Sequence, residues 1–278
     1  MPKSWRLILS GPCDAYANMA VDEAIFLACC GEKAIPTLRL YTWDPPALSL
    51  GCAQDPREEL DLDKCARANI HVVRRISGGG IIFHDQELTY SLSCRKEDIG
   101  AFGSIADSYK TLCAFLLAAY RTLGLSPVFA HEAGVGLLRQ RPSVFCFSSF
   151  AKYDILVGGK KIGGNAQRRK KDFIFQHGSI PLEFDGKKAT SFLKKDAGRI
   201  EEKACALNEA AGKKIDLCTL RDVLVQSFRG ALGVGLIEGE LTVQEKAFAL
   251  RLREEKYSRQ EWNLQRHEYH VEEACMAA

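Results

Sequence analysis

The sequence lacks any apolar run long enough to cross a membrane. Its longest apolar stretch, from Cys113 to Tyr120, is far shorter than the about 20 residues that a membrane-spanning helix needs. A secretory signal is missing as well, because the apolar run that ends at Leu9 is short and no small-residue cleavage site follows it. We therefore expect a cytoplasmic protein that makes no use of a membrane.

Cysteine is not scarce, but the pairs that hold metals are missing. Eleven cysteines are scattered along the chain, and no two of them form a Cys-x-x-Cys pair. Such pairs are typical of zinc sites and of thioredoxin-type redox sites, so neither is expected, and no metal or cofactor is predicted. An odd number of cysteines in a long chain fits a reducing compartment, in which most thiols are small buried hydrophobes.

The glycine motifs that bind nucleotides are missing too. Residues Arg74 to Asp85 read Arg-Arg-Ile-Ser-Gly-Gly-Gly-Ile-Ile-Phe-His-Asp, without Gly-Lys-Ser/Thr and without a helix expected after the glycines. Three successive glycines, Gly78 to Gly80, instead let backbone N–H groups come close to a ligand. From the glycines alone, a loose connection between two strands fits as well.

Acidic residues are few between Ala151 and Lys195. This segment has eleven lysines and arginines against four acids, a local charge of +7, whereas the whole chain carries +3. Solvated hairpin tips explain part of this charge, and the rest predicts a docking surface for an acidic partner. Nucleic acid is not the expected partner, because stacking aromatic residues are sparse here.

The residues that are present predict strands and helices in irregular order. Helices are expected at 14–30, 60–69, 104–124 and 242–257, the last of which opens with a Thr-Val-Gln-Glu capping box. Strands are expected at 37–43, 70–75, 81–84, 87–94, 152–157, 160–168 and 173–182. From Asp185 onward the pattern turns helical. Consecutive hairpins, rather than regular βαβ units, favour an α+β fold without linkers or internal repeats.

A second glycine-rich segment runs from Gly159 to Gln167. In a regular strand, alternate residues from Lys161 to Gln167 would point to one side, and those from Ile162 to Ala166 to the other. Glycines inside a strand often mark close approach of a ligand, where Lys161 would add a fixed positive charge. An exposed lysine on an edge strand would give the same pattern.

Cys146 is the candidate nucleophile. A thiol has a pKa of about 8.5, so only a few per cent is thiolate at pH 7, and a nearby ammonium group raises that fraction. Lys161 lies 15 residues further on, one hairpin away. A contact between the two side chains is therefore feasible.

Five ordered motifs together resemble the lipoate/biotin ligase and octanoyltransferase superfamily over nearly the whole chain. They are Asn18 to Ala24, Arg74 to Asp85, Lys160 to Gln167 with Asn165 where Ser is usual, Gln176 to Ile180, and Lys256-Tyr257 with Glu261 to Asn263. The resemblance implies an α+β fold with a mixed or antiparallel sheet flanked by helices and a hydrophobic acyl tunnel. It also implies a single catalytic domain at 1–265 and a tail at 266–278.

Two features resemble the cysteine-dependent octanoyltransferases of this superfamily. Cys146-Phe147 is similar to their nucleophile position, although Ser148-Ser149-Phe150 stands where a proline usually follows. Only 16 residues follow Trp262, which leaves no room for the small accessory domain of many ATP-dependent ligases. Both features favour transfer from an acyl thioester over ligation driven by ATP.

The resemblance thus implies an octanoyltransferase of lipoate biosynthesis. Cys146 would take the octanoyl group from octanoyl-acyl carrier protein, and a lysine of a lipoyl domain or of the glycine-cleavage H protein would accept it. Lys161 would support the Cys146 thiolate. The substrate-binding residues are predicted to be Arg75, Ser77, Gly78, Gly79, Gly80, His84, Gly163, Gly164, Asn165, Ala166, His177 and Gly178. An ATP-dependent lipoate ligase, a lipoyl amidotransferase and an inactive binding relative remain alternatives.

Overall fold

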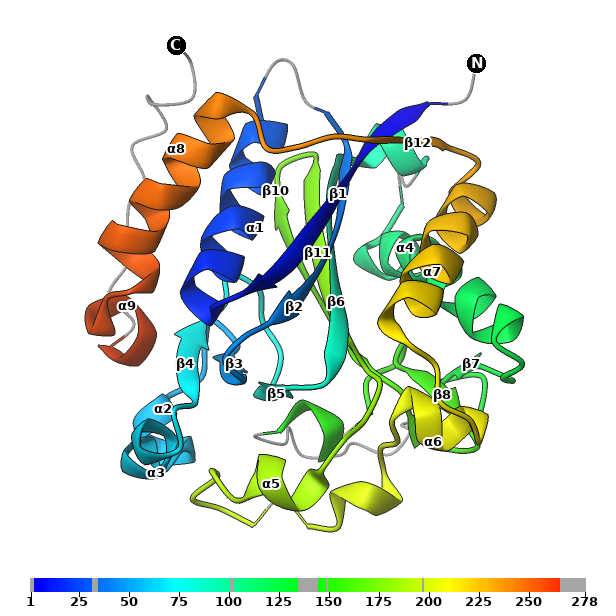
Figure 1. Cartoon of the computed structure of the whole chain (residues 1–278). Helices are drawn as coiled ribbons and strands as arrows, with labels where there is room; N and C mark the ends of the chain where they lie inside the picture. Colours follow the sequence, from blue (N-terminus) through cyan, green and yellow to red (C-terminus); the bar gives the residue numbers. More distant parts are fainter. Residues whose placement is uncertain are drawn as a thin grey trace.

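A six-stranded mixed sheet lies at the centre of the molecule (Figure 1). The structure, a computed structural model, describes residues 3–31, 35–100, 103–134, 145–148, 150–196 and 198–265. Ser149 and the expected tail at 266–278 lie outside these residues. Within the described ranges, no helix is both long and apolar enough to span a bilayer.

The central sheet has the strand order β10-β11-β6-β2-β1-β12. Its strands are β1 (Ser4–Cys13), β2 (Thr37–Trp43), β6 (Glu87–Arg95), β10 (Gly164–Lys170), β11 (Phe173–Pro181) and β12 (Gly235–Glu238). The first strand pairs in parallel with β2 and β12, whereas all other neighbours are antiparallel. The expected α+β class with a mixed sheet is therefore confirmed.

Two pairs of helices cover the two faces of this sheet (Figure 1). They are α1 (Ala15–Cys29) with α8 (Val243–Leu252) on one face, and α4 (Ile105–Thr122) with α7 (Leu217–Leu232) on the other. The Asp14 carboxylate caps α1 and Ser104 opens α4 with a capping box, so both helices begin where the sequence predicts. Apolar side chains on their inner sides form the core, each contributing about 1.5–3 kcal/mol.

Two small sheets flank the central one. The first contains β3 (Ala47–Leu50), β4 (His71–Arg74) and β5 (Ile82–His84), and the second contains β7 (Val128–Phe129), β8 (Ile155–Val157) and β9 (Lys160–Lys161). The remaining helices are α2 (Pro56–Glu59), α3 (Leu62–Arg67), α5 (Gly186–Thr190), α6 (Leu207–Ala211) and α9 (Gln260–Gln265). Short turns of other helix types are η1 (Lys96–Ile99), η2 (Cys146–Ser148), η3 (Ile200–Glu202) and η4 (Arg253–Tyr257).

The prediction of one strand at 160–168 is wrong. The chain leaves the β8-β9 pair after Lys161 and enters the central sheet at Gly164. Ile162 is fully buried at this step, and a Cβ on Gly163 would lie only 2.6 Å from the Ser179 carbonyl oxygen. The strand is thus interrupted where these two backbones approach closely, and the residues from Lys161 to Gly164 do not follow the alternation of one regular strand.

Other strand predictions need smaller corrections. The strand expected at 152–157 begins only at Ile155, because the Asp154 carboxylate accepts a hydrogen bond from the Ala151 N–H and closes a turn. No strand was expected for β1 or β3. The helical pattern expected after Asp185 is interrupted by β12.

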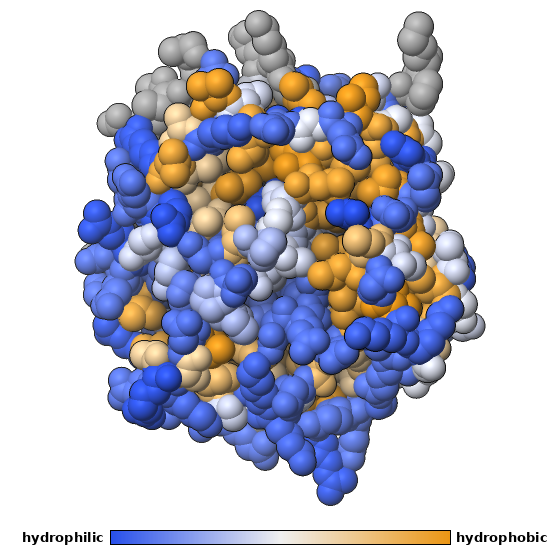
Figure 2. Space-filling view, viewed as in Figure 1, coloured by the Kyte–Doolittle hydropathy of each residue, from blue (hydrophilic) through white to orange (hydrophobic). Residues whose placement is uncertain are grey.

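One face of the molecule is divided between apolar and polar side chains. Figure 2 shows apolar side chains gathered in its upper part and mainly hydrophilic ones in its lower part, around α5. Among the exposed apolar residues, Leu9 lies on β1 and Ile237 on the edge strand β12.

Candidate active site

Cys146 lies in the short turn η2, held beside the strand β5. Its backbone N–H donates to the Ile81 carbonyl oxygen over 3.0 Å, and Phe145 and Phe147 on either side of it are buried. The side chain of Cys146 itself is partly exposed. The two buried rings thus fix the turn, while the thiol stays within reach of a ligand.

The structure brings Lys161 to Cys146. The Lys161 Nζ lies 3.4 Å from the Cys146 Sγ and donates to the Cys146 carbonyl oxygen over 3.0 Å. It also donates to Asp154 Oδ2 over 2.7 Å, and both side chains of this ion pair are only 3% exposed. The three residues form a compact cluster of sulfur, ammonium and carboxylate.

The charge state of Lys161 follows from its surroundings. Burial lowers the pKa of a lysine, because it removes water from the ammonium group. At Lys161 this loss is more than offset by the Cys146 sulfur and the Asp154 carboxylate, so that its pKa lies above the ordinary value. The lysine is therefore a cation at neutral pH, and its ammonium group lies directly beside the Cys146 sulfur.

Gly164 provides the space for the sulfur. A Cβ at this position would lie 3.1 Å from the Cys146 Sγ and 3.3 Å from a methyl carbon of Ile82. Few Cβ contacts in proteins are that short, so a side chain here would press on the thiol. The glycine of the second motif thus allows the first residue of β10 to lie against Cys146.

The buried side chain of Arg75 holds the first glycine motif in place. It is 2% exposed, and its guanidinium donates to the carbonyl oxygens of Ser49, Gly78 and Gly80. Among the described residues, its Nε has no hydrogen-bond partner, which leaves one buried donor available to a ligand. Burial lowers the pKa of Arg75 to about 10, so the group remains cationic at neutral pH.

His84 lies between two buried polar partners, Ser49 and Glu87. Its Nδ1 lies 2.8 Å from Glu87 Oε1 and its Nε2 lies 2.6 Å from Ser49 Oγ, while its ring stacks on Trp43 at 3.9 Å. Burial alone would raise the pKa of Glu87, but His84, Ser179 and Thr89 together lower it. Glu87 is thus an anion that fixes the orientation of the His84 ring.

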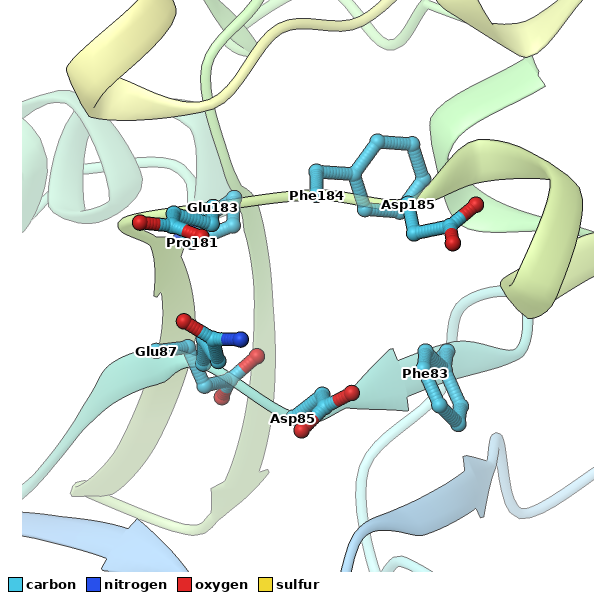
Figure 3. Close-up of a pocket in the computed structure, with 8 residues that line it drawn as sticks. Phe83, Asp85, Glu87, Pro181, Glu183, Phe184 and Asp185 are labelled. Carbon is cyan, nitrogen blue, oxygen red and sulfur yellow. The ribbon is translucent and has the colours of Figure 1, made fainter.

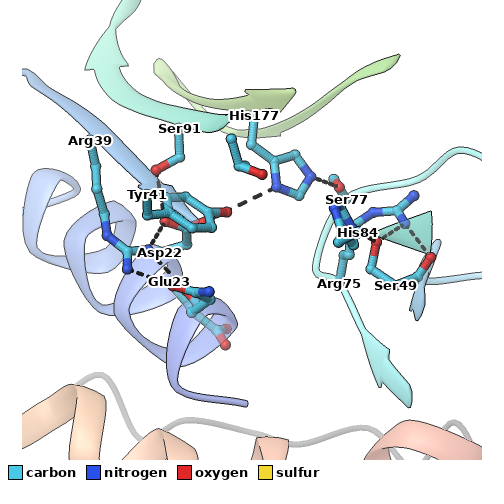
Figure 4. A network of polar contacts seen from close by, with 12 residues as sticks. Asp22, Glu23, Arg39, Tyr41, Ser49, Arg75, Ser77, His84, Ser91 and His177 are labelled. Atoms are coloured by element: carbon cyan, nitrogen blue, oxygen red, sulfur yellow. Dashed lines mark hydrogen bonds and ion pairs between the residues drawn. The ribbon is translucent and has the colours of Figure 1, made fainter. Parts of the chain in front are cut away.

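His177 joins the glycine turn to the first helix (Figure 4). Its Nε2 lies 2.6 Å from Ser77 Oγ, and its Nδ1 lies 4.0 Å from Asp22 Oδ2. The Tyr41 hydroxyl donates to the same carboxylate oxygen over 2.7 Å. Burial, Arg75 and His84 hold the pKa of His177 well below its ordinary value, so it is neutral at neutral pH.

Six of the predicted substrate-binding residues line one narrow pocket. Its lining includes the following residues of that prediction: Arg75, His84, Gly164, Ala166, His177 and Gly178. Trp43, Ile82, Thr89 and Ser179 complete it. The cavity volume is about 10 Å³, enough for about one water molecule. An acyl chain would need more space, so the acyl tunnel stays a prediction.

The other predicted residues lie around this pocket without lining it. Ser77 contacts His177, and the carbonyl groups of Gly78 and Gly80 bind Arg75, whereas Gly79 is exposed. Gly163 lies against β11. The Asn165 side chain accepts a hydrogen bond from the Tyr90 hydroxyl over 2.8 Å, which ties β10 to the sheet core.

A larger pocket of about 310 Å³ opens where β5 and β11 end (Figure 3). Four carboxylates surround it, together with two phenylalanine rings: Asp85, Glu87, Glu183, Asp185, Phe83 and Phe184. The Phe184 ring contacts Phe147, the neighbour of Cys146, at a centroid distance of 5.3 Å. The negative charge of the carboxylates around this pocket disfavours an acidic partner at its opening.

Several lysines and arginines of the basic segment between Ala151 and Lys195 make contacts within the protein, so part of its charge is not available to a partner. Lys160 pairs with Glu209, Lys188 pairs with Asp85, and Arg169 donates to Ser104 and Ser108. Arg168 is exposed, although it donates to the Ile76 carbonyl oxygen over 2.8 Å. Lys171, at the tip of the β10-β11 hairpin, is exposed and is one of the charges that remain available for docking.

Sequence reasoning missed Asp154 and Glu87. Asp154 directly precedes an apolar strand. An aspartate at this position predicts a turn as readily as an ion pair, so nothing in the sequence favoured the ion pair. Glu87 follows the His84 motif by three residues, and this spacing was the available signal for their contact. In the described part of the chain, no group of three or more His, Cys, Asp or Glu side chains is arranged to hold a metal ion.

Known proteins resemble this chain over most of its length. A sequence model of the lipoyl protein ligase A/B catalytic domain matches residues 14–229, within the catalytic domain expected at 1–265. The octanoyltransferase LipM of Kyrpidia tusciae is 37% identical over 271 residues, covering 94% of this chain and 98% of the relative. LipM of Bacillus subtilis is 34% identical over 275 residues, covering 95% and 99%.

Solved structures agree with these sequence matches. A lipoate-protein ligase A crystallised with ATP superimposes with a TM-score of 0.80 at 26% identity, covering 95% of this chain and 100% of the other. The lipoic acid complex of Ta0514 from T. acidophilum, described as a putative lipoate protein ligase, gives a TM-score of 0.77 at 25% identity, covering 94% and 99%.

Proposed function

The chain belongs to the lipoyl protein ligase A/B catalytic domain family, and we propose that it transfers an octanoyl group through a thioester on Cys146. It is an acyltransferase, an octanoyltransferase of lipoate biosynthesis, as its LipM relatives at 34–37% identity indicate. The observation that supports the proposed route is the contact of 3.4 Å between the Lys161 ammonium and the Cys146 sulfur. The intermediate, the donor and the acceptor are the parts that we propose.

The first half of the reaction loads the enzyme. The Cys146 thiolate attacks the carbonyl carbon of octanoyl-acyl carrier protein, the bond from that carbon to the carrier sulfur breaks, and the carrier thiol leaves after taking up a proton. Lys161 supports the attacking thiolate with its positive charge. The N–H of Lys161 that faces the sulfur is also proposed to donate to the oxygen that becomes negative in the transition state.

The second half unloads the enzyme onto a lysine. The neutral ε-amine of a lipoyl domain or of the glycine-cleavage H protein attacks the thioester carbon, the bond to the Cys146 sulfur breaks, and the amine gives up one proton as the amide forms. The sulfur returns to the thiolate that began the cycle. No ATP enters either step, because the energy of the donor thioester drives the transfer.

The donor is proposed to dock at the tip of the β10-β11 hairpin. The positive charge around Lys171 fits an acidic carrier protein, and the acidic pocket beside Phe184 does not. Arg75, His84 and His177, which line the narrow pocket, are proposed to contact the substrate beside Cys146. A cytoplasmic location remains a prediction.

ATP-driven ligation is the competing reaction, because the lipoate-protein ligase with bound ATP has the same fold. The two reactions differ in one measurement, the exchange of radiolabelled pyrophosphate into ATP in the presence of lipoate. We expect no exchange by this chain, together with octanoylation of a lipoyl domain when octanoyl-acyl carrier protein is given without ATP. Exchange above background, with no transfer from the carrier protein, would establish the ligase instead.

A further inference from the structure

We infer that Asp154 is a positioning residue that keeps Lys161 charged and in place after Cys146 has been acylated. The inference rests on the proposed thioester route. Its geometric basis is that the Lys161 ammonium faces the Cys146 sulfur at 3.4 Å, which is a thiolate when it attacks in the proposed route, and the Asp154 carboxylate at 2.7 Å. Only the first of these changes charge during the reaction.

Acylation removes the charge from the sulfur. A thiolate becomes a neutral thioester when it takes up the octanoyl group, so Lys161 loses one of its two anionic neighbours. Burial continues to disfavour the ammonium form, since Lys161 is only 2% exposed. The Asp154 carboxylate then remains to hold the lysine as a cation beside the thioester carbonyl.

The position of Asp154 suits this role. Its side chain is 3% exposed, and its Oδ2 accepts from both the Lys161 Nζ and the Ala151 N–H, which fixes the carboxylate in one orientation. The Lys161 ammonium is thereby held at three points, on Asp154 Oδ2, the Cys146 carbonyl oxygen and the Cys146 sulfur. Two of these three contacts survive when the sulfur is acylated.

Few other titratable groups reach this cluster. Tyr109 and Cys113 on α4 interact with Asp154, but burial raises the pKa of both, so they are neutral at neutral pH. Arg75 also interacts electrostatically with Cys146 and adds a further positive charge. Asp154 is therefore the one carboxylate among the described residues that contacts Lys161.

The two half-reactions must respond differently to the loss of this carboxylate. In an Asp154→Asn enzyme, the thiolate itself still holds Lys161 charged during the first half-reaction. In the acyl-enzyme of that variant neither anion remains, so the pKa of Lys161 falls, and its positive charge is lost at the higher pH values. Transfer to the acceptor therefore weakens as the pH rises, whereas loading does not.

The experiment measures each half-reaction separately in single turnovers at pH 6.5 and pH 8.5. Octanoyl-acyl carrier protein is the donor and a lipoyl domain the acceptor, with intact mass as the readout. We expect Asp154→Asn to transfer about tenfold or more slowly than wild type at pH 8.5 and to approach wild type at pH 6.5, since each pKa unit is worth a factor of ten. Its loading should lack this pH dependence.

Glu23→Gln is the matched control, because Glu23 is also a buried carboxylate whose oxygens contact a lysine ammonium over 2.7 and 2.8 Å. It should leave the pH profile of transfer unchanged. Asp154→Glu retains the charge and should restore the wild-type profile, so it tests the inference even if Asp154→Asn fails to fold.

Three results would overturn the inference: an equal loss of transfer at both pH values in Asp154→Asn, no loss at all, or a pH-dependent loss in Asp154→Glu. Failure of the proposed function looks different, because wild-type enzyme would then form no acyl-enzyme at any pH.

Discussion

Two buried lysines of this protein have almost the same local geometry but different surroundings. Lys161 lies 2.7 Å from the Asp154 carboxylate, and Lys256 lies 2.7 Å from the Glu23 carboxylate, with each lysine side chain 3% exposed. Burial lowers the pKa of both, but the Cys146 sulfur and Asp154 raise that of Lys161 above the ordinary value, whereas Glu23 only partly offsets the effect at Lys256. The sulfur beside Lys161 and the positive charge of Arg168 near Lys256 separate the two sites.

The surroundings of Lys256 indicate a structural role. Its ammonium lies 4.1 Å from the centre of the Trp262 ring, and the indole N–H of Trp262 donates to the Arg74 carbonyl oxygen. The Tyr257 hydroxyl donates to the same carboxylate oxygen of Glu23 as Lys256 does. This cluster therefore anchors the C-terminal helices to the strand that precedes Arg75. A buried lysine with a carboxylate partner is thus not by itself a sign of chemistry.

The largest expected effect is on stability, and it should be similar at the two sites. Lys161→Met and Lys256→Met each leave a carboxylate buried without its cation, which costs about 3–5 kcal/mol. The free energy of unfolding from urea titration measures this loss. Replacing both partners, as in Lys256→Met with Glu23→Gln, should recover most of it, and a double variant no more stable than Lys256→Met would show that the ion pair is not the cause.

Activity should separate the two lysines. Lys161→Met removes the charge beside the thioester and should lower the rate of octanoyl transfer by about 10²–10³, the loss typical of a removed transition-state donor. Lys256→Met should keep most of its activity at a temperature where it is folded. Single-turnover transfer to a lipoyl domain gives both rates. Equal losses in the two variants would assign Lys161 the same structural role as Lys256.

The reactivity of the thiol tests the same difference without substrate. Lys161→Ala removes the cation 3.4 Å from the sulfur, so it should slow alkylation of Cys146 by iodoacetamide several-fold at pH 7 and much less at high pH. Lys256→Ala should leave the rate unchanged. Peptide mapping follows the modified Cys146 against the other cysteines. An unchanged pH profile in Lys161→Ala would remove this lysine from the support of the thiolate.

The smallest effect is the pH dependence of stability, which has opposite sign at the two sites. The raised pKa of Lys161 gives stability that is present below about pH 10.4, the ordinary lysine pKa, and is lost as the pH rises through its folded value. The lowered pKa of Lys256 makes stability rise with pH in the window just below the ordinary value. Urea titrations of wild type and the two Lys→Met variants from pH 8 to 10 should show the second trend disappearing in Lys256→Met alone.

Much of the fold could be predicted from local sequence signals, whereas the contacts within the site could be predicted only in part. Helices α1 and α4 were predicted because their caps and apolar stripes are local signals. The strand β1 was not, because its partners β2 and β12 lie far apart in the sequence. Spacing allowed a contact of Lys161 with Cys146 without establishing it, and the approach of Gly164 to the sulfur was out of reach. Both contacts depend on the break at Ile162 and Gly163, which an alternating strand pattern conceals.

The central claim is that Cys146 carries the octanoyl group, and the mass of the enzyme tests it most directly. Wild-type enzyme incubated with octanoyl-acyl carrier protein and no ATP should gain the mass of one octanoyl group, mapped to the peptide of Cys146 and removed by hydroxylamine, which cleaves thioesters but not amides. Cys146→Ser should gain no such labile adduct and should not turn over. If Cys146→Ala still modifies a lipoyl domain, and does so only when ATP is present, the thioester account is contradicted.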